Sequence, residues 1–282
     1  MGLKVNTNVN ALQILNSMDI TNNRVSQSLQ RLSSGLRINS AKDDASGFAI
    51  ANSFAAKITS MKVASQNANE AQSMLQTADG AYSKINDILV RMKSLATQAA
   101  SGQTESLATM NNEFKNLQDE IDRIASSTKY GTKSLVDGSA AQNGITFQVG
   151  ATNTGVDRIE VKFDGATAGC LGVSSGANGT NPALSISTLA SAQAAMDALD
   201  TALTSINAFM GSVGAYQNRL QYTVENLSIS IENYSSSEST IRDVDMASEM
   251  STFTKNQILQ QSAMAMLAQA NSAPQQILTL LR

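Results

Sequence analysis

Few residues of this chain are suited to chemistry. Its 282 residues contain no histidine and only one cysteine, Cys170. A chain without histidine lacks the usual general base and cannot form a Ser/His/Asp triad. One thiol can neither close an intrachain disulfide nor complete a Cys/His zinc site. A P-loop and a GxGxxG sequence are also absent, so we expect no enzyme, no cofactor and no bound metal.

One pair of adjacent carboxylates, Asp43 and Asp44, lies in the stretch SSGLRINSAKDDASG, residues 33 to 47. Adjacent carboxylates can bind a metal or act as acid and base, but no histidine or further carboxylate cluster lies nearby. Gly35 and Asn39 are typical of helix ends, and either aspartate can cap a following helix. We interpret the stretch as a linker followed by a helix cap.

Composition excludes several classes of partner. The net charge is −3 and charged residues make up 15% of the chain, so no basic face is available for nucleic acid or anionic lipid. No run of about 18 apolar residues is present, which argues against a membrane span. The N-terminal residues MGLKVNTNVNALQ lack an apolar signal-peptide core. We expect export, if it occurs, to proceed without a cleaved leader.

The final stretch, residues 241–282, predicts a helix with two apolar stripes. A helix on a globular surface usually has one apolar face, so this helix requires several partners. At alternating three- and four-residue steps, one stripe comprises Met246, Met250, Phe253, Gln257, Gln260, Met264 and Leu267, and the other comprises Val244, Ala247, Ser251, Thr254, Ile258, Ala265 and Ala268.

The first helical stretch has the same spacing. Its stripe comprises Ala11, Ile14, Met18, Thr21, Val25, Ser28 and Leu32, with Leu29 and Leu36 alongside. The two ends can form a short coiled coil, each helix being marginal alone. Periodicity equally allows an ordinary helical hairpin that closes a monomer.

Between the two ends, long helical patterns flank a β-element. Three-four spacing covers residues 45–99, 107–124 and 189–234, and Ser235, Ser236 and Ser237 are expected to loosen the join to the last helix. Alternating residues at 145–149 and 159–163 predict a β-hairpin, and 164–183 is expected to be an exposed loop. We predict a mainly α fold: an elongated antiparallel helical bundle or coiled coil, with both termini at one end and a small β-hairpin in the middle of the chain.

Such a plan fits two classes of protein: a self-assembling subunit and a coiled-coil signalling or scaffold protein. Chemoreceptor hairpins are also long antiparallel helices rich in Ala and Gln. The β-element and the lack of a membrane span count against a receptor. The double stripe at the chain ends favours assembly.

Several motifs resemble bacterial flagellins. These are VNTNVNALQ (5–13), LQRLSSGLRINSAKDDASGFAIA (29–51), ITFQVGATNTG (145–155) and QILQQSAMAMLAQANSAPQQILTLLR (257–282). The resemblance implies a short flagellin without large outer domains, and the hook-associated junction proteins are the nearest alternative. It implies a terminal coiled-coil domain (1–44 and 236–282) that is disordered in the monomer. It also implies a core helical domain (45–140 and 184–235) that carries the β-hairpin element and a short surface loop (141–183).

The resemblance also implies function and partners. The chain is expected to be exported unfolded, to polymerise at the filament tip and to reside outside the cell in the flagellar filament. Expected partners are other copies of the chain, an export chaperone on residues 241–282, the filament cap, the hook-associated junction proteins and the host Toll-like receptor for flagellin. The residues expected to carry the terminal coiled coil and polymerisation are Ile14, Met18, Val25, Leu29, Leu32, Met250, Phe253, Ile258, Met264 and Leu267.

The receptor motif of the family matches Arg91, Leu95 and Glu120 in this chain. Val90 stands where strongly recognised flagellins usually carry Gln, and Ser94 stands where they often carry Glu. The resemblance therefore implies recognition by the receptor, weakened relative to those flagellins.

Overall fold

The computed structural model describes residues 8–101, 106–139, 144–174 and 184–280, with side chains described as far as residue 272. Contacts divide the chain into two units. Unit 1 comprises Met1–Ile58 and Glu232–Arg282, and unit 2 comprises Thr59–Ile231. The domain boundaries predicted at residues 44/45 and 235/236 both fall inside unit 1 and stay a prediction.

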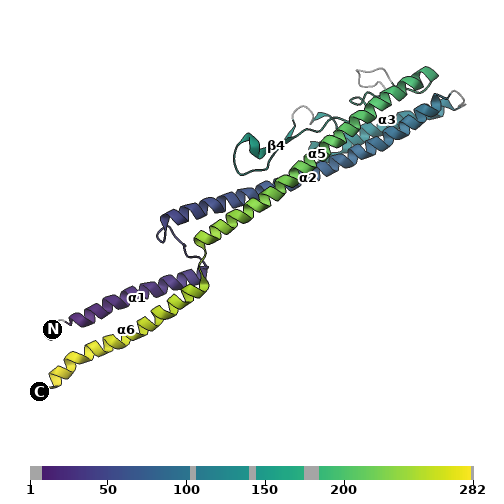
Figure 1. The fold of residues 1–282 in the computed structure, drawn as a ribbon. Helices are drawn as coiled ribbons and strands as arrows, with labels where there is room; N and C mark the ends of the chain where they lie inside the picture. Colours follow the sequence, from purple (N-terminus) through teal and green to yellow (C-terminus); the bar gives the residue numbers. More distant parts are fainter. Residues whose placement is uncertain (1–7, 102–105, 140–143, 175–183, 281–282) are drawn as a thin grey trace. The chain divides into compact units, whose positions relative to one another are not determined.

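Unit 1 is built on the pairing of the first and last helices, α1 (Val9–Ser34) and α6 (Met246–Leu280). They run antiparallel side by side (Figure 1). The Asn8 side chain caps α1 by accepting from the Ala11 amide, and its Nδ2 donates to the Ala270 carbonyl over 2.8 Å. The beginning of α1 and the last part of α6 therefore lie next to each other. The helix α6 continues through Pro274.

The α1–α6 seam mixes apolar and polar side chains. On α1 the buried or half-buried residues include Ala11, Ile14, Met18, Thr21, Val25, Ser28 and Leu32. On α6 they include Glu249, Phe253, Asn256, Gln260, Ala263, Leu267 and Ala270. Two polar residues of this seam are fully covered, since Ser28 is 4% exposed and Asn256 is 6% exposed. Because polar side chains occupy these seam positions, the α1–α6 pair buries less apolar surface than a fully apolar seam would.

The segments that lead out of α1 and into α6 pair with each other. Gly35 ends α1 in a left-handed conformation with φ 71°, as is common at a helix C-terminus. The Arg37 amide then donates to the Arg242 carbonyl at 2.7 Å, and the Val244 amide donates to the Gly35 carbonyl at 3.0 Å. We call this backbone pairing, between residues 35–38 and 242–244, the clasp.

Unit 2 has a core to which three helices contribute: α2 (Ala45–Ala99), α3 (Leu107–Ser127) and α5 (Leu189–Arg242). The apolar residues recur every three or four positions, which places them on one face of each helix. The largest buried side chains include Leu75, Tyr82, Ile85, Leu89, Met92, Phe114, Ile121, Leu199 and Ile206. The expected loosening at Ser235–Ser237 is wrong. There α5 stays helical to Arg242, with the Ser237 hydroxyl donating to the Asn233 carbonyl.

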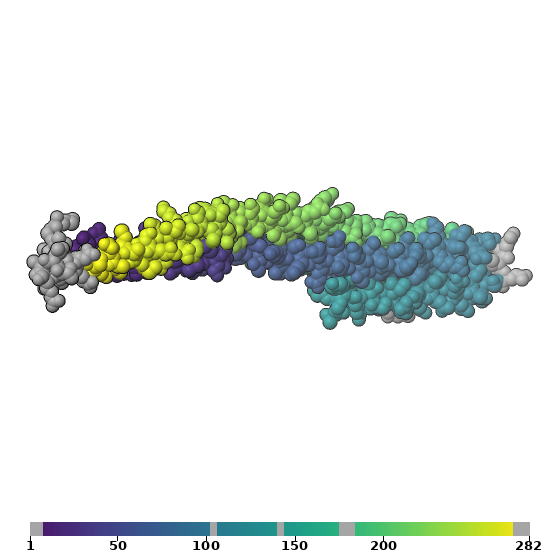
Figure 2. Space-filling model, turned by 90° about the horizontal axis from the view of Figure 1, so that it is seen from below, coloured from purple at the N-terminus to yellow at the C-terminus, as the bar shows by residue number. Residues whose placement is uncertain are grey.

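Small β-elements connect α3 to α5. β1 (Lys129–Tyr130) pairs with β2 (Lys133–Ser134). The predicted hairpin is confirmed: β3 (Ile145–Gln148) and β4 (Arg158–Val161) are antiparallel, with Ile145 opposite Val161 and Phe147 opposite Ile159. A short 3₁₀ turn, η1 (Gly155–Asp157), precedes β4. The teal part of the chain, which contains this hairpin, lies against the blue surface of α2 (Figure 2).

The segment after β4 is largely buried and anchored to the helices. Ala166, Ala168, Leu171 and Val173 are at most 6% exposed, so the expectation of an exposed loop is wrong for these residues, whereas Gly169 and Cys170 are exposed. Helix side chains satisfy its backbone: the Tyr82 hydroxyl donates to Asp164 O at 2.7 Å, Gln118 Nε2 donates to Val173 O at 2.6 Å, and Asp122 accepts from the Ala168 amide at 2.7 Å. Residues 175–183 lie outside the described residues.

Taken unit by unit, the fold confirms a mainly α chain of antiparallel helices with a small β-hairpin, and its first and last helices lie side by side.

Candidate assembly interface

The α1–α6 seam contains specific polar contacts. Gln260 Nε2 donates to Asn22 Oδ1 at 2.8 Å. One turn of α6 closer to the clasp, Asn256 is buried. Still closer to the clasp, Arg31 Nη1 lies 3.7 Å from Glu249 Oε2, and the two side chains are 28% and 11% exposed. Because buried polar groups need partners, such contacts favour one alignment of the two helices over alignments shifted by a turn.

The residues predicted for the terminal coiled coil divide into two sets. Six of them lie half-buried along the seam: Ile14, Met18, Val25, Leu32, Phe253 and Leu267. Four point away from it, because Leu29 is 49% exposed, Met250 48%, Ile258 57% and Met264 49%. The structure therefore brings the first set together and leaves the second set exposed. The seam residues that apolar periodicity missed on α6 include Glu249, Asn256, Ala263 and Ala270, which are polar or small.

The exposed faces of α1 and α6 are rich in large apolar side chains. A soluble monomer rarely exposes contiguous apolar patches unless they bind something. On α1 these residues are Val9, Leu12, Leu15, Ile20 and Leu29, and on α6 they are Met246, Met250, Ile258, Leu259, Met264 and Met266. A shallow groove on α6 is lined by Met250, Thr254, Ile258 and their neighbours. The arrangement suits packing against further helices.

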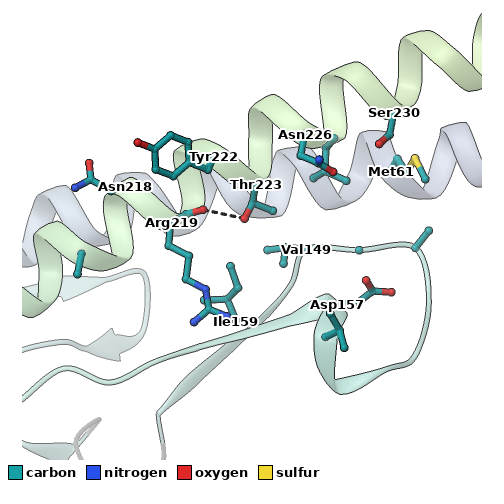
Figure 3. Close-up of a pocket in the computed structure, with 15 residues that line it drawn as sticks. Met61, Val149, Asp157, Ile159, Asn218, Arg219, Tyr222, Thr223, Asn226 and Ser230 are labelled. Carbon is teal, nitrogen blue, oxygen red and sulfur yellow. Dashed lines mark hydrogen bonds between the residues drawn. The ribbon is translucent and has the colours of Figure 1, made fainter.

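In unit 2 a cavity of about 660 Å³ lies between α5 and the β3–β4 loop (Figure 3). Its α5 wall carries Tyr222 and Thr223, whose hydroxyl donates to the Arg219 carbonyl at 2.8 Å. Asp157, on the loop, accepts from the Thr152 hydroxyl and from the Thr152 amide. These bonds hold the pKa of the Asp157 carboxyl below its ordinary value, and the bond from the Thr152 hydroxyl contributes most. The carboxylate therefore organises the loop, and the lining offers no pair of groups for acid–base work.

The residues matched to the receptor motif occupy different environments. Arg91 on α2 is exposed and donates to Glu113 of α3, with Nη2 2.7 Å from Oε1. Leu95 is only 2% exposed and belongs to the core. Glu120 pairs instead with Arg123, and the Arg123 guanidinium lowers the pKa of the Glu120 carboxyl. The sequence reading missed Glu113, which lies seven residues before Glu120 and so on the same side of α3, about two turns away.

Of the two adjacent aspartates, Asp44 caps the following helix, as the sequence indicated, whereas Asp43 binds the turn before it. Asp43 Oδ2 accepts from the Asn39 and Ser40 amides and from the Ser40 hydroxyl. The Ser40 amide is the largest cause of the lowered pKa of Asp43. Asp44 Oδ1 accepts from the amide of Gly47 at the start of α2. Within the described residues no group of three His, Cys, Asp or Glu side chains is placed to hold a metal.

Cys170 is exposed and its thiol is free. Among the helices that the structure describes, none is long and apolar enough to span a membrane.

Comparison with known proteins identifies the family of this chain. The bacterial flagellin N-terminal helical region matches residues 5–141, and the bacterial flagellin C-terminal helical region matches residues 196–281. The flagellin of Bacillus subtilis strain 168 is 39% identical over 307 residues, covering 99% of this chain and 100% of that protein. The flagellar filament 33 kDa core protein of Treponema phagedenis is 39% identical over 288 residues, covering 99% of each.

Among solved structures, the crystal structure of Bacillus cereus flagellin aligns with a TM-score of 0.48 and 30% identity, covering 57% of this chain and 88% of that one. The two family regions and the full-length relatives give the identity. The chain belongs to the bacterial flagellin family and is a structural subunit of a flagellar filament, not an enzyme.

Proposed function

We propose that this subunit polymerises through two different faces of its terminal helices. The seam face pairs α1 with α6 inside one chain. The exposed apolar face, which includes Leu29, Met250, Ile258 and Met264, packs against neighbouring copies. One observation carries the proposal: on α6 the seam takes Glu249 and a buried Asn256, while these large apolar side chains remain in solvent.

The energetics support assembly-dependent order at the chain ends. Fixing a residue costs about 1–2 kcal/mol of backbone entropy. Burial returns about 25 cal/mol per Å² of apolar surface. A seam that contains Ser28, Asn256 and the Asn22–Gln260 pair gains little free energy from apolar burial. Neighbouring copies that cover the exposed stripe supply the remainder, so the terminal segments 1–44 and 236–282 fold fully only in the polymer.

Export in an unfolded state fits the same chain. A lone cysteine, Cys170, means that no intrachain disulfide has to be made or broken during export. The exposed stripe of α6 would be uncovered before assembly. An export chaperone on residues 241–282 therefore has a physical purpose, because it would keep those side chains from aggregating. Cap and hook-associated junction proteins would meet the same terminal helices at the two ends of the filament.

The receptor contact would centre on the exposed charges of unit 2. Arg91 and Glu113 form an accessible pair, and Glu120 continues the line along α3, while Leu95 supports the surface from beneath. Arg91→Ala is expected to reduce receptor signalling in reporter cells, and Lys84→Ala, at an exposed position on the same helix, is the matched control. Equal signalling by both variants and the wild type would refute this contact.

The assembly proposal is tested with a deletion and one substitution. Deleting residues 243–282 is expected to leave the core helical by circular dichroism and to abolish filaments in seeded polymerisation. Leu267→Asp introduces a charge into the half-buried seam and is expected to block polymerisation without changing the melting of the core. Leu267→Met keeps the volume and is expected to polymerise. Filaments from the deleted chain would overturn the proposal.

A further inference from the structure

The described methionines of this chain range from fully buried to largely exposed. Those of the core, Met74, Met92 and Met110, are 5%, 0% and 8% exposed. By contrast, Met246 and Met250 on α6 are each 48% exposed. Two more on α6, Met264 at 49% and Met266 at 62%, are also exposed. Side chains that stand this far into solvent are open to reagents that the core methionines do not meet.

Three of the exposed methionines share one side of α6. Met264 follows Met246 by 18 residues, which is about five helical turns and returns to the same direction. Met250 is one turn from Met246. Met266 is rotated by about 200° from that direction and lies on another side of the helix. We call Met246, Met250 and Met264 the methionine stripe.

The stripe borders the seam residues of the same helix. Glu249 and Phe253 face α1, and the stripe lies next to them at the edge of the pair. The chain is a filament subunit, so an apolar surface on its terminal helices has further copies of the chain available to cover it. Methionine suits such a surface, since its flexible thioether adapts to a partner helix.

We propose that the methionine stripe makes assembly sensitive to oxidation: peroxide acting on the unassembled chain converts the stripe to sulfoxides and thereby blocks polymerisation. The inference rests on the proposed packing of the exposed α6 face against neighbouring copies. In the reaction each sulfur takes one oxygen atom from hydrogen peroxide, and a molecule of water leaves. The sulfur loses two electrons, and the peroxide is reduced.

The consequence follows from the polarity of the product. A sulfoxide is a polar, chiral group that replaces an apolar one, and such groups disrupt methionine-rich interfaces. Burying one without a hydrogen-bond donor opposes docking of the next subunit. We expect oxidation of the stripe to lower the rate of seeded elongation by at least about tenfold. Chains already in the filament, with the stripe covered, react more slowly.

The experiment uses the full-length chain. Monomer is treated with hydrogen peroxide, the sulfoxide at each methionine is measured by peptide mass spectrometry, and elongation of seeds is followed by sedimentation and electron microscopy. The test variant carries Met246→Leu, Met250→Leu and Met264→Leu, which keep size and apolarity but remove the sulfur. The matched control is Met266→Leu, which removes an equally exposed sulfur outside the stripe.

Oxidised wild type and oxidised Met266→Leu are expected to lose elongation, and the treated triple variant is expected to keep it. Methionine sulfoxide reductases should restore the wild type. The proposal is overturned if fully oxidised wild type elongates normally, or if peroxide inhibits the triple variant equally. Should the triple variant fail to polymerise untreated, the oxidation rates decide: stripe methionines that react equally fast in filament and monomer also overturn it.

Deletion of residues 243–282 and oxidation of the stripe test different properties of α6. If deletion of residues 243–282 abolishes filaments but oxidation is harmless, α6 drives assembly and only the role of the stripe is refuted. If the chain without residues 243–282 forms filaments, both the proposed assembly through α6 and the proposed role of the methionine stripe are refuted.

Discussion

Substituting Tyr82 by phenylalanine tests how unit 2 holds its irregular segment. The ring of Tyr82 is fully buried, and its hydroxyl donates to Asp164 O at 2.7 Å. The ring also packs against Phe209, with centroids 6.0 Å apart. Tyr82→Phe keeps that packing and removes only the hydrogen bond. Leaving a carbonyl without its buried donor costs about 1–3 kcal/mol.

A loss of about 1.5 kcal/mol corresponds to a fall in Tm of about 3–6 °C for a unit of this size. Thermal unfolding followed by circular dichroism measures it directly. The matched control is Tyr222→Phe, because Tyr222 is 70% exposed. That change should stay within about 0.5 kcal/mol of the wild type. A Tyr82→Phe variant that melts within 1 °C of the wild type, about the precision of such a measurement, would refute the reasoning.

The same substitution has a signature in alkaline solution. Burial raises the pKa of the Tyr82 phenol above its ordinary value, so the folded chain keeps the proton at a pH where the unfolded chain has lost it. The stability linked to this group is therefore complete below about pH 10 and falls as the pH rises further, by at most about 1.4 kcal/mol per pH unit. Tyr82→Phe removes this part of the pH dependence, which urea titrations of both proteins at pH 9 to 11 can detect.

Two further outcomes follow from the region around β3 and β4. Gly165→Ala would place a Cβ 2.7 Å from the Gly138 Cα and should lower the free energy of unfolding, measured by urea titration, by about 1–3 kcal/mol. The control is Gly155→Ala, whose Cβ would meet nothing within 4 Å and which should leave the free energy of unfolding nearly unchanged. The lowered pKa of Asp157 means that its bonds to Thr152 are present above the ordinary carboxyl pKa and are lost as the pH falls through the depressed value. Hydrogen exchange should show the Thr152 amide losing protection over that acidic range, and Asp157→Asn should remove this pH dependence; an unchanged profile would contradict the assignment.

Much of the architecture could be predicted from periodicity. Apolar residues at three- and four-residue steps marked α2, α3 and α5, because burying one face of a long helix leaves a strong pattern. The alternation Ile145, Phe147, Val149 marked the hairpin for the same reason. Asp44 was interpreted correctly as a helix cap, since it accepts a backbone amide at the start of α2, whereas Asp43 accepts the Ser40 amide before the helix.

Other features depend on contacts that a linear pattern does not contain. The α6 seam includes Glu249, which pairs with Arg31 of α1, and Asn256, which is buried, although the polarity of both residues predicts an exposed position. Ala166 and Val173 lie in a stretch rich in glycine and serine, yet helix side chains bond its backbone and so allow its burial. Glu113 gave no signal as a partner of Arg91, because their pairing needs the packing of α2 on α3.

The clasp has a consequence for how the chain ends find each other. Residues 37 and 242 are separated by more than 200 positions, and closing a flexible loop of that length costs more entropy than closing a short one. The clasp closes it once, through bonds between backbone atoms that survive side-chain substitution. Beyond it, α1 and α6 meet as tethered neighbours at a high effective concentration. Even a weak polar seam can then align them, and the exposed apolar side chains of both helices stay available for another molecule.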